Sequence, residues 1–251
     1  MTSPPGRRVG ACQAEAGPSY PPATVPPATR AAFFDVDGTL VRTNIVHSLA
    51  FYAVNQGSLF GTAWHAARTV ASLPLFWAAD QVNRKAFNEL FYRYYRGQSE
   101  DRLLELSDEL FESVLEPAIY PGTPALLDQA RRAGCRIVLC TGALDFTVRR
   151  LARHLGADEL IANRMRFVAG AATGQVVPPI IEGAHKALVI RDYCVREGLR
   201  LDQSFAYSDS ISDYPMLAVV GHPTAVNPDR KLRSVARAYE WPILQTTDEM
   251  T

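Results

Sequence analysis

The sequence predicts an α/β fold in which a parallel β-sheet carries helices on both faces and is interrupted by a helical insertion. Beyond about residue 118, short apolar runs typical of strands alternate with helical patterns, the order expected of such a sheet. Between residues 44 and 117 the pattern is helical throughout. A chain of 251 residues is long enough for a core domain and a small second domain.

The first 30 residues differ from the rest in composition. They are rich in proline, alanine and small polar residues, and contain no apolar run long enough for a secretory signal peptide. Arg7 and Arg8 are not followed by the hydrophobic segment of a twin-arginine export signal. The predicted parts of the chain are a disordered arm at 1–30, a core domain formed by 31–43 and 118–251, and a helical cap domain at 44–117.

Two aspartates follow the first predicted strand. Residues 31–34 form a short apolar run that leads into Asp35, Val36, Asp37 and Gly38. Because residues i and i+2 of a strand face the same way, we expect both carboxylates on one face at the carboxyl edge of the sheet. Such a pair can bind Mg²⁺ and supply a nucleophile and a proton donor, although Asp-x-Asp-Gly also occurs in turns and calcium loops.

Four helices are predicted in the insertion. The predicted spans are Ile45 to Asn55, Ser58 to about Pro74, Asn83 to Arg96, and Ser99 to about Pro117. The stretch from Leu59 to Ala79 is unusually apolar, but His65, Arg68 and Pro74 interrupt it, whereas a membrane span needs ~20 predominantly apolar residues. We expect a cap helix packed within the cap, and contact with an apolar substrate or a membrane surface stays open.

The chain returns to the core through a helix and a strand. Thr123 as N-cap and Gly134 as terminator predict a helix between them. Arg136 to Cys140 is typical of a strand, and it is followed by Thr141, Gly142 and a second helical pattern. Because a hydroxyl and free backbone N–H groups at a helix start bind phosphate, this pair is a predicted phosphate site.

Three further segments complete the predicted core. They are a β-hairpin of structural role at Met165 to Pro178, a helix at His185 to Glu197 and a strand at Ser204 to Ser208. Lys186 lies in the first turn of the helix, where its ammonium group can neutralise a phosphoryl oxygen. Asp209 and Asp213 follow the strand and are predicted to complete a metal site.

These groups of residues, in this order, resemble the motifs of the haloacid dehalogenase-like (HAD) phosphatases. The groups are Asp35-Val36-Asp37-Gly38-Thr39, Thr141-Gly142, Lys186, and Asp209 with Asp213. Over about residues 31 to 243 the chain is similar to subfamily IB, the phosphoserine-phosphatase-like branch. The resemblance implies a Rossmann-like parallel-sheet core, the HAD fold, with an inserted C1-type cap that is a four-helix bundle.

The resemblance also implies a mechanism. It makes Asp35 the nucleophile that forms an aspartyl-phosphate, and Asp37 the acid that protonates the leaving oxygen and then activates water. The implied Mg²⁺ ligands are the Asp35 carboxylate, the Asp37 main-chain carbonyl, Asp209 and Asp213. The implied phosphate-binding residues are Thr141, Gly142 and Lys186, of which Thr141 and Lys186 also count as catalytic.

We therefore expect a Mg²⁺-dependent phosphatase, a phosphoric monoester hydrolase, that acts on a small-molecule phosphomonoester. Two alternatives stay open, a phosphotransferase that uses the same aspartyl-phosphate and a non-catalytic phosphate-binding module. Expected substrates are histidinol phosphate, phosphoserine-like or specialised-metabolite phosphates, or a lipid-like phosphate. The predicted substrate contacts, for which packing is an equal alternative, are Asn44, His47, Arg84, Phe87 and Arg93.

Asn44 marks a departure from the phosphoserine phosphatases. In those enzymes a glutamate nine residues after the nucleophile receives the ammonium group of the substrate, and here that position is Asn44. An amide does not pair with an ammonium group as a carboxylate does. The substitution argues against phosphoserine itself as the substrate.

Composition narrows the expected partners and location. The chain has 26 Lys and Arg against 26 Asp and Glu, so its net charge gives no attraction to nucleic acid. The aromatic and basic run at residues 92–96 suits base stacking, but such a helical pattern more often packs into a core. The four cysteines show neither metal-binding spacing nor a disulfide framework, which favours the reducing cytoplasm. The oligomeric state is not predicted.

Overall fold

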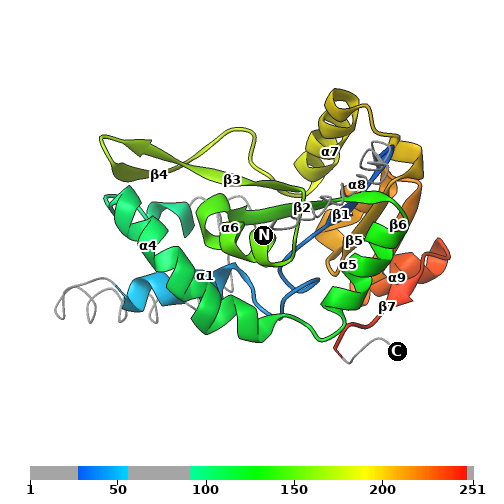
Figure 1. The fold of residues 1–251 in the computed structure, drawn as a ribbon, viewed down its shortest axis with the longest axis horizontal. Helices are drawn as coiled ribbons and strands as arrows, with labels where there is room; N and C mark the ends of the chain where they lie inside the picture. The colour runs from blue at the N-terminus through cyan, green and yellow to red at the C-terminus, as the bar shows by residue number, and fades with distance from the viewer. Residues whose placement is uncertain (1–27, 56–90, 248–251) are drawn as a thin grey trace, which may run out of the picture.

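The computed structural model describes residues 28–55 and 91–247, and their strands form one seven-stranded sheet (Figure 1). Its order is β4-β3-β2-β1-β5-β6-β7. The strands are β1 Arg30–Phe34, β2 Cys135–Leu144, β3 Glu159–Val168, β4 Ala171–Val177, β5 Phe205–Ser208, β6 His222–Val226 and β7 Ile243–Leu244. Neighbouring strands are parallel except for β4, which runs antiparallel to β3 at one edge. The predicted α/β fold is confirmed.

Helices cover both faces of the sheet. They are α1 Ile45–Val54, α4 Glu100–Leu110, α5 Thr123–Arg132, α6 Asp145–His154, α7 Ala184–Glu197, α8 Tyr214–Ala218 and α9 Arg230–Ala238. Ala32 and Phe34 of β1 belong to an apolar cluster with α1, α4, α5 and α6, whereas Ala31 and Phe33 belong to a second cluster with α7, α8 and α9. This alternation is the two-residue period of a strand that is buried on both sides.

Several predicted helices are present, with ends close to the predicted ones. Helix α1 covers the first predicted cap helix, and α7 ends at Gly198, whose φ of +67° is the left-handed conformation of a helix C-cap. The predicted helix from Ser58 to Pro74 and the apolar stretch from Leu59 to Ala79 lie outside the described residues. Within the described ranges, no helix has the length and apolar character needed to cross a membrane.

The helix predicted from Ser99 to about Pro117 is confirmed at both ends, whereas the start of α5 differs from the prediction by one residue. Ser99 is the N-cap of α4, although its side chain makes no cap hydrogen bond, and the helical run continues through a π-helical turn at 111–115 and ends in a 3₁₀ turn at 116–118. Thr123 is the first helical residue and Gly122 the N-cap. The Thr123 hydroxyl donates instead to the Leu40 carbonyl at 2.8 Å, which joins α5 to the loop after β1.

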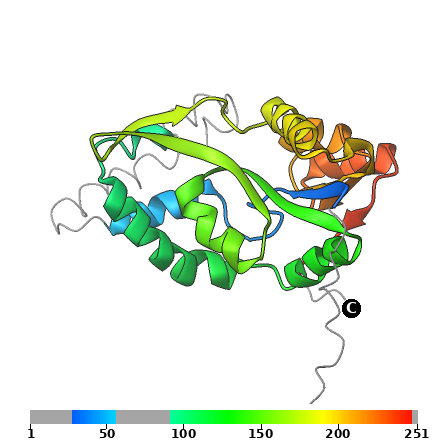
Figure 2. The same cartoon turned by 45° about the horizontal axis from the view of Figure 1, so that its top comes forward.

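The predicted hairpin is present, but its first strand is longer than expected. Strand β3 begins in the parallel sheet beside β2, where Leu139 pairs with Leu160, and then continues into the antiparallel pair with β4. The β4 end of the hairpin is bonded to the insertion: Gly97 N–H donates to the Ala172 carbonyl at 2.7 Å, and Ala172 N–H to the Gln98 carbonyl at 2.8 Å. Figures 1 and 2 show the hairpin reaching over α4. The hairpin therefore connects the sheet to the insertion.

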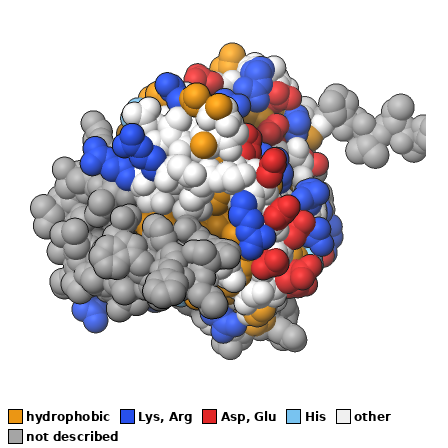
Figure 3. Space-filling view, turned by 90° about the vertical axis from the view of Figure 1, so that its left-hand side faces the viewer, with side chains coloured by type: hydrophobic (Ala, Val, Ile, Leu, Met, Phe, Trp, Pro, Cys, Tyr) orange, Lys and Arg blue, Asp and Glu red, His pale blue; other side chains and the backbone are white. Residues whose placement is uncertain are grey.

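Charged side chains of both signs share the end of the molecule that carries α4. Figure 3 shows acidic and basic side chains intermixed over the described part of this face. One such pair joins Arg102 and Glu105 at 3.2 Å, with both side chains exposed. This mixture agrees with the balanced net charge of the chain.

Candidate active site

The motif residues gather where β1 and β5 lie side by side in the middle of the sheet. Chain connections leave these two strands toward opposite edges, so their carboxyl ends form the switch point where α/β sheets bind ligands. Asp35 follows β1 directly, and its N–H donates to the Tyr207 carbonyl of β5 at 2.9 Å. Asp209 follows β5 directly. Two carboxylates that are far apart in the sequence thus meet at one point.

Lys186 lies between two buried carboxylates. Its Nζ is 2.6 Å from Asp35 Oδ1 and 2.7 Å from Asp213 Oδ2, and all three side chains are buried. The Ser208 hydroxyl also donates to Asp213 Oδ2 at 2.8 Å. Burial by itself lowers the pKa of Lys186, but Asp213 and Asp35 outweigh it and raise the pKa above its usual range. Lys186 therefore keeps its positive charge in the centre of the site.

Thr39 and Gly38 bring Asp209 against the loop after β1. The Thr39 hydroxyl lies 3.4 Å from Asp35 Oδ2 and 3.2 Å from Asp209 Oδ1. Gly38 has a φ of +81°, and a Cβ atom there would lie 2.2 Å from Asp209 Oδ2. Only glycine therefore allows Asp209 to lie this close to the loop.

Burial also changes the protonation of the two aspartates. It raises the pKa of Asp35 to about 8, against the effect of Lys186, and raises the pKa of Asp209 to about 6.

Asp35 and Asp37 both lie beyond the end of β1, so the loop after the strand places them, and not the alternation of side chains within the strand as predicted. The strand ends at Phe34, and the loop then turns at Gly38. The Asp37 carboxylate accepts a hydrogen bond from the Thr43 hydroxyl at 3.0 Å. Burial raises the pKa of Asp37, while the Thr43 bond opposes this effect. A carboxyl group with a raised pKa suits the role of a proton donor.

Thr141 and Gly142 do not stand at a helix start, which corrects the prediction. Strand β2 continues to Leu144 with an irregularity after Cys140, and α6 begins only at Asp145. Thr141 is buried, and its Oγ1 accepts a hydrogen bond from Ala143 N–H at 3.1 Å. The pair is thus held by an extended backbone segment that ends before α6 begins.

Of the predicted substrate contacts, Asn44, His47 and Arg93 lie among the described residues, and His47 is close enough to Asp37 that its charge acts to lower the pKa of that carboxyl. Asn44 and His47 are exposed and form a capping box at the start of α1, in which Asn44 Oδ1 accepts from Val46 N–H at 3.0 Å and His47 Nδ1 accepts from Asn44 N–H at 3.2 Å. Arg93 is exposed and lies against β4, since a Cβ on Gly174 would be 3.1 Å from the Arg93 Cα. Arg84 and Phe87 lie outside the described residues.

The structure adds polar side chains to which no role was assigned from the sequence. Thr39, Thr43 and Ser208 donate hydrogen bonds to the aspartates. Serine and threonine are common beside any motif, so their presence in the sequence did not indicate these bonds. Asn163 is 1% exposed in the middle of β3, and its side chain bonds to Gly142. Asparagine is depleted in strands, so its position in an apolar strand pattern is a signal that was available.

The carboxylates also determine how a metal ion fits. Within the described ranges, no three or more His, Cys, Asp or Glu side chains are arranged as a metal-binding group. Asp35 and Asp209 offer two hard oxygen donors that share the Thr39 hydroxyl. Mg²⁺ typically takes one or two protein carboxylates and completes its shell with water and phosphate oxygens. The donor set fits such an ion, and one ammonium group among three acids leaves negative charge for it to balance.

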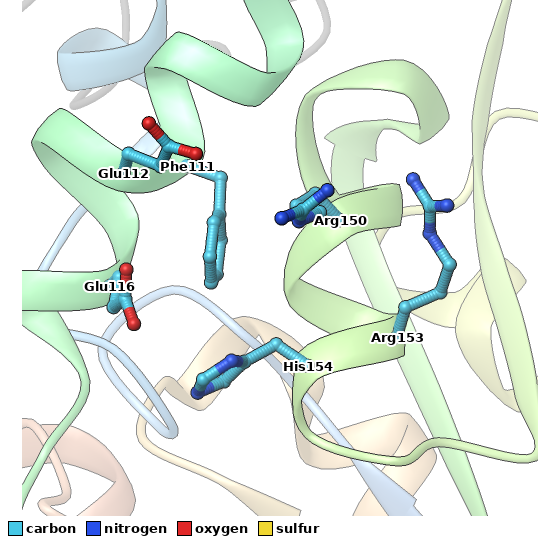
Figure 4. Close-up of a pocket in the computed structure, with 6 residues that line it drawn as sticks. All are labelled: Phe111, Glu112, Glu116, Arg150, Arg153 and His154. Atoms are coloured by element: carbon cyan, nitrogen blue, oxygen red, sulfur yellow. The ribbon is translucent and has the colours of Figure 1, made fainter.

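A separate groove of about 370 Å³ lies between α6 and the π-helical turn after α4 (Figure 4). It is lined by Phe111, Glu112, Glu116, Arg150, Arg153 and His154. Figure 4 shows Phe111 between the two glutamates and the basic side chains of α6, and its ring centroid lies 5.1 Å from that of His154. The groove contains none of the motif residues and mixes both signs of charge, so we assign it no part in the chemistry.

Comparison with known proteins decides the family. The family model described as haloacid dehalogenase-like hydrolase matches residues 32–218, a range that includes every motif residue described above. The chain belongs to the haloacid dehalogenase-like hydrolases. Within this family it lies in the phosphoserine-phosphatase-like branch, and it is a phosphatase. The resemblance seen in the motifs is confirmed.

Individual relatives agree with this placement of the hydrolase. The chain is 33% identical to phosphoserine phosphatase SerB1 of Mycobacterium tuberculosis over 86% of its own length and 70% of the relative. It is 32% identical to the probable phosphatase Rv3661 of the same organism, covering 92% and 80% of the two chains. A crystal structure of a protein of unknown function from Bordetella pertussis Tohama I has the same fold, with a TM-score of 0.76, 24% identity and coverage of 86% and 98%.

Proposed function

We propose that this hydrolase is a Mg²⁺-dependent phosphatase that cleaves a small-molecule phosphomonoester through an aspartyl-phosphate. One observation carries the proposal. Lys186 Nζ contacts Asp35 at 2.6 Å in a buried site to which Thr39 also brings Asp209. A cation beside an acidic nucleophile is the arrangement that phosphoryl transfer needs, because catalysis depends on charge stabilisation and positioning.

In the proposed first step, Asp35 attacks phosphorus. An oxygen of its carboxylate forms a bond to phosphorus while the bond from phosphorus to the alcohol oxygen breaks, and Asp37 gives its proton to that oxygen. In the second step Asp37 takes a proton from water, the water oxygen attacks phosphorus, and the bond to Asp35 breaks. Inorganic phosphate leaves and both aspartates return to their starting states.

The remaining motif residues would hold the phosphoryl group and the metal. Lys186, the Thr141 hydroxyl and the Gly142 backbone are the proposed partners of the phosphoryl oxygens. The proposed metal ligands are Asp35, the Asp37 carbonyl and Asp209, with Asp213 acting through Lys186 or water. When bound, Mg²⁺ supplies positive charge that favours the ionised form of Asp35 and balances the phosphoryl oxygens.

We propose that this phosphatase does not recognise its substrate by pairing a substrate ammonium group with residue 44. Relatives named phosphoserine phosphatase make a small phosphomonoester the best candidate class. The Asn44 side chain, however, is used in capping α1 and carries no charge. Histidinol phosphate, specialised-metabolite phosphates and lipid-like phosphates are therefore tested beside phosphoserine.

The test is phosphate release from a panel of metabolite phosphates, with Mg²⁺ and with a chelator. Asp35→Asn is expected to lose at least ~10³-fold in kcat, as expected when a nucleophile is removed. Asp128→Asn is the matched control, because it makes the same chemical change at an exposed carboxylate paired with Arg131 on α5. Full activity of Asp35→Asn or in the chelator contradicts the proposal. Turnover only with an added alcohol favours phosphotransfer, and phosphate binding without turnover favours a binding module.

A further inference from the structure

Asn163 joins three separate segments of the chain beside the proposed phosphate site. Its Oδ1 accepts from Ile181 N–H at 2.7 Å, and its Nδ2 donates to the Gly142 carbonyl at 2.7 Å and to the Tyr92 hydroxyl at 3.0 Å. The Ile181 N–H requires an acceptor, which sets the orientation of the amide and turns its NH₂ group toward Gly142. Ile181 lies in the segment that leads into α7, the helix of Lys186.

The bond to Gly142 reaches Thr141 through a single peptide group. In the peptide between Gly142 and Ala143, Asn163 binds the carbonyl, and Thr141 Oγ1 accepts from the N–H. Both ends of the peptide are therefore held, and its orientation sets the position of the Thr141 oxygen. Because that oxygen accepts from Ala143, the hydroxyl hydrogen is left to donate to a phosphoryl oxygen.

Tyr92 brings the insertion into the same network. Its hydroxyl accepts from Asn163 and donates to the Gly142 carbonyl at 3.4 Å, and Tyr92 is 3% exposed. Gly142 also lies close to the backbone of Ile181, because a Cβ there would lie 3.3 Å from the Ile181 carbonyl oxygen. The peptide that holds Thr141 thus contacts both the insertion and the segment before α7.

We propose that Asn163 is a positioning residue that orients the Thr141 hydroxyl through the Gly142 peptide, and that Tyr92 couples this orientation to the position of the insertion. The proposal rests on the role of Thr141 in the proposed function. Asn163 and Tyr92 touch no reacting atom in this scheme, and they act by holding the group that does.

The first test compares two hydroxyl deletions that are matched in burial. Tyr92→Phe is expected to raise the inhibition constant of inorganic phosphate and to lower kcat/KM about 3- to 10-fold, the effect of one lost hydrogen bond. Tyr52→Phe is the control, because the Tyr52 hydroxyl is buried and donates to the Leu103 carbonyl at 3.1 Å within the insertion. Equal losses in both variants, or none in Tyr92→Phe, overturn the coupling to the insertion.

The second test is a double-mutant cycle. Asn163→Ala is expected to lower kcat/KM about 10- to 100-fold in the wild-type background and much less in Thr141→Val, since the effect passes through the Thr141 hydroxyl. If Asn163→Ala does not fold, the same cycle is measured with Tyr92→Phe in place of Asn163→Ala, again in the wild-type and Thr141→Val backgrounds. Losses that add independently, with thermal stability lowered equally in both backgrounds, assign the residues a purely structural role.

Direct binding of inorganic phosphate separates this inference from the proposed function. If wild type binds phosphate but shows no turnover, the proposed function fails and the same cycle is measured on phosphate affinity. If wild type turns over and Thr141→Val does so equally well, the positioning of Thr141 has no consequence and the inference fails alone.

Discussion

The carboxyl edge of the sheet and the start of the insertion use polar side chains in opposite ways. At the sheet edge, Lys186 bonds to Asp35 across 151 residues of sequence, and Thr39 bonds to Asp209 across 170. At the insertion, Asn44 bonds to a residue only three positions away, and its side chain is exposed. One region joins distant segments inside the protein, and the other completes a single helix at the surface.

This difference has an energetic meaning. Burying charges is costly even when they are paired, so a cluster of three acids and one ammonium group is weak evidence for stability and better evidence for function. A capping box satisfies N–H groups at a helix start and stabilises the helix directly. Substitutions in the two regions should therefore change different quantities, activity in the first and stability in the second.

The largest effect in this comparison is expected for Asp37→Asn at the sheet edge. An amide cannot give a proton to the leaving oxygen, so kcat on alkyl phosphates should fall about 10²- to 10⁴-fold. The first step with p-nitrophenyl phosphate, whose leaving group needs no proton, should slow much less, whereas the second step still requires Asp37 as the base on either substrate. Pre-steady-state release of p-nitrophenol, compared with release of the alcohol from an alkyl phosphate, measures the difference. Equal losses in this first step would mean that Asp37 does not act as the acid.

A smaller effect that combines both quantities is expected for Gly38→Ala. The positive φ alone costs a residue with a side chain about 1–2 kcal/mol, and the new Cβ would also displace Asp209. Gly134→Ala is the matched control, because Gly134 has a φ of +74° with no described atom within 4 Å of its added Cβ.

Urea unfolding and kinetics together distinguish the two glycine variants. Both should lose stability by a similar amount from the backbone, but only Gly38→Ala should lose activity as well. Retention of full activity by Gly38→Ala would show that the site tolerates a shift of Asp209.

The smallest effect on activity is expected for Asn44→Ala at the insertion. Loss of the cap should lower the free energy of unfolding by about 1 kcal/mol, while kcat/KM stays within about twofold of wild type. Urea unfolding and kinetics on the best substrate of the panel measure both. A KM that rises tenfold or more at unchanged stability would support the prediction that Asn44 contacts the substrate.

Local patterns in the sequence were enough to predict the fold class and the elements that carry most of the motif residues. Alternating strand and helix patterns placed Lys186 at a helix start and Asp209 after a strand, and parallel strands bring such residues to one edge whatever the details of packing. The extent of β2 past Thr141 was not predicted, because glycine and threonine at a strand end are equally compatible with a turn into a helix.

Only the tertiary structure decided which partners the polar groups have. Asp213 and Asp209 are both acids near the end of β5, yet one faces Lys186 and the other faces Thr39. The bonds of Asn163 to Gly142 and Tyr92 join segments that no local pattern relates. A short-range pattern reports how one segment folds, whereas the pairing of buried polar groups is set by the free energy of the whole packed arrangement.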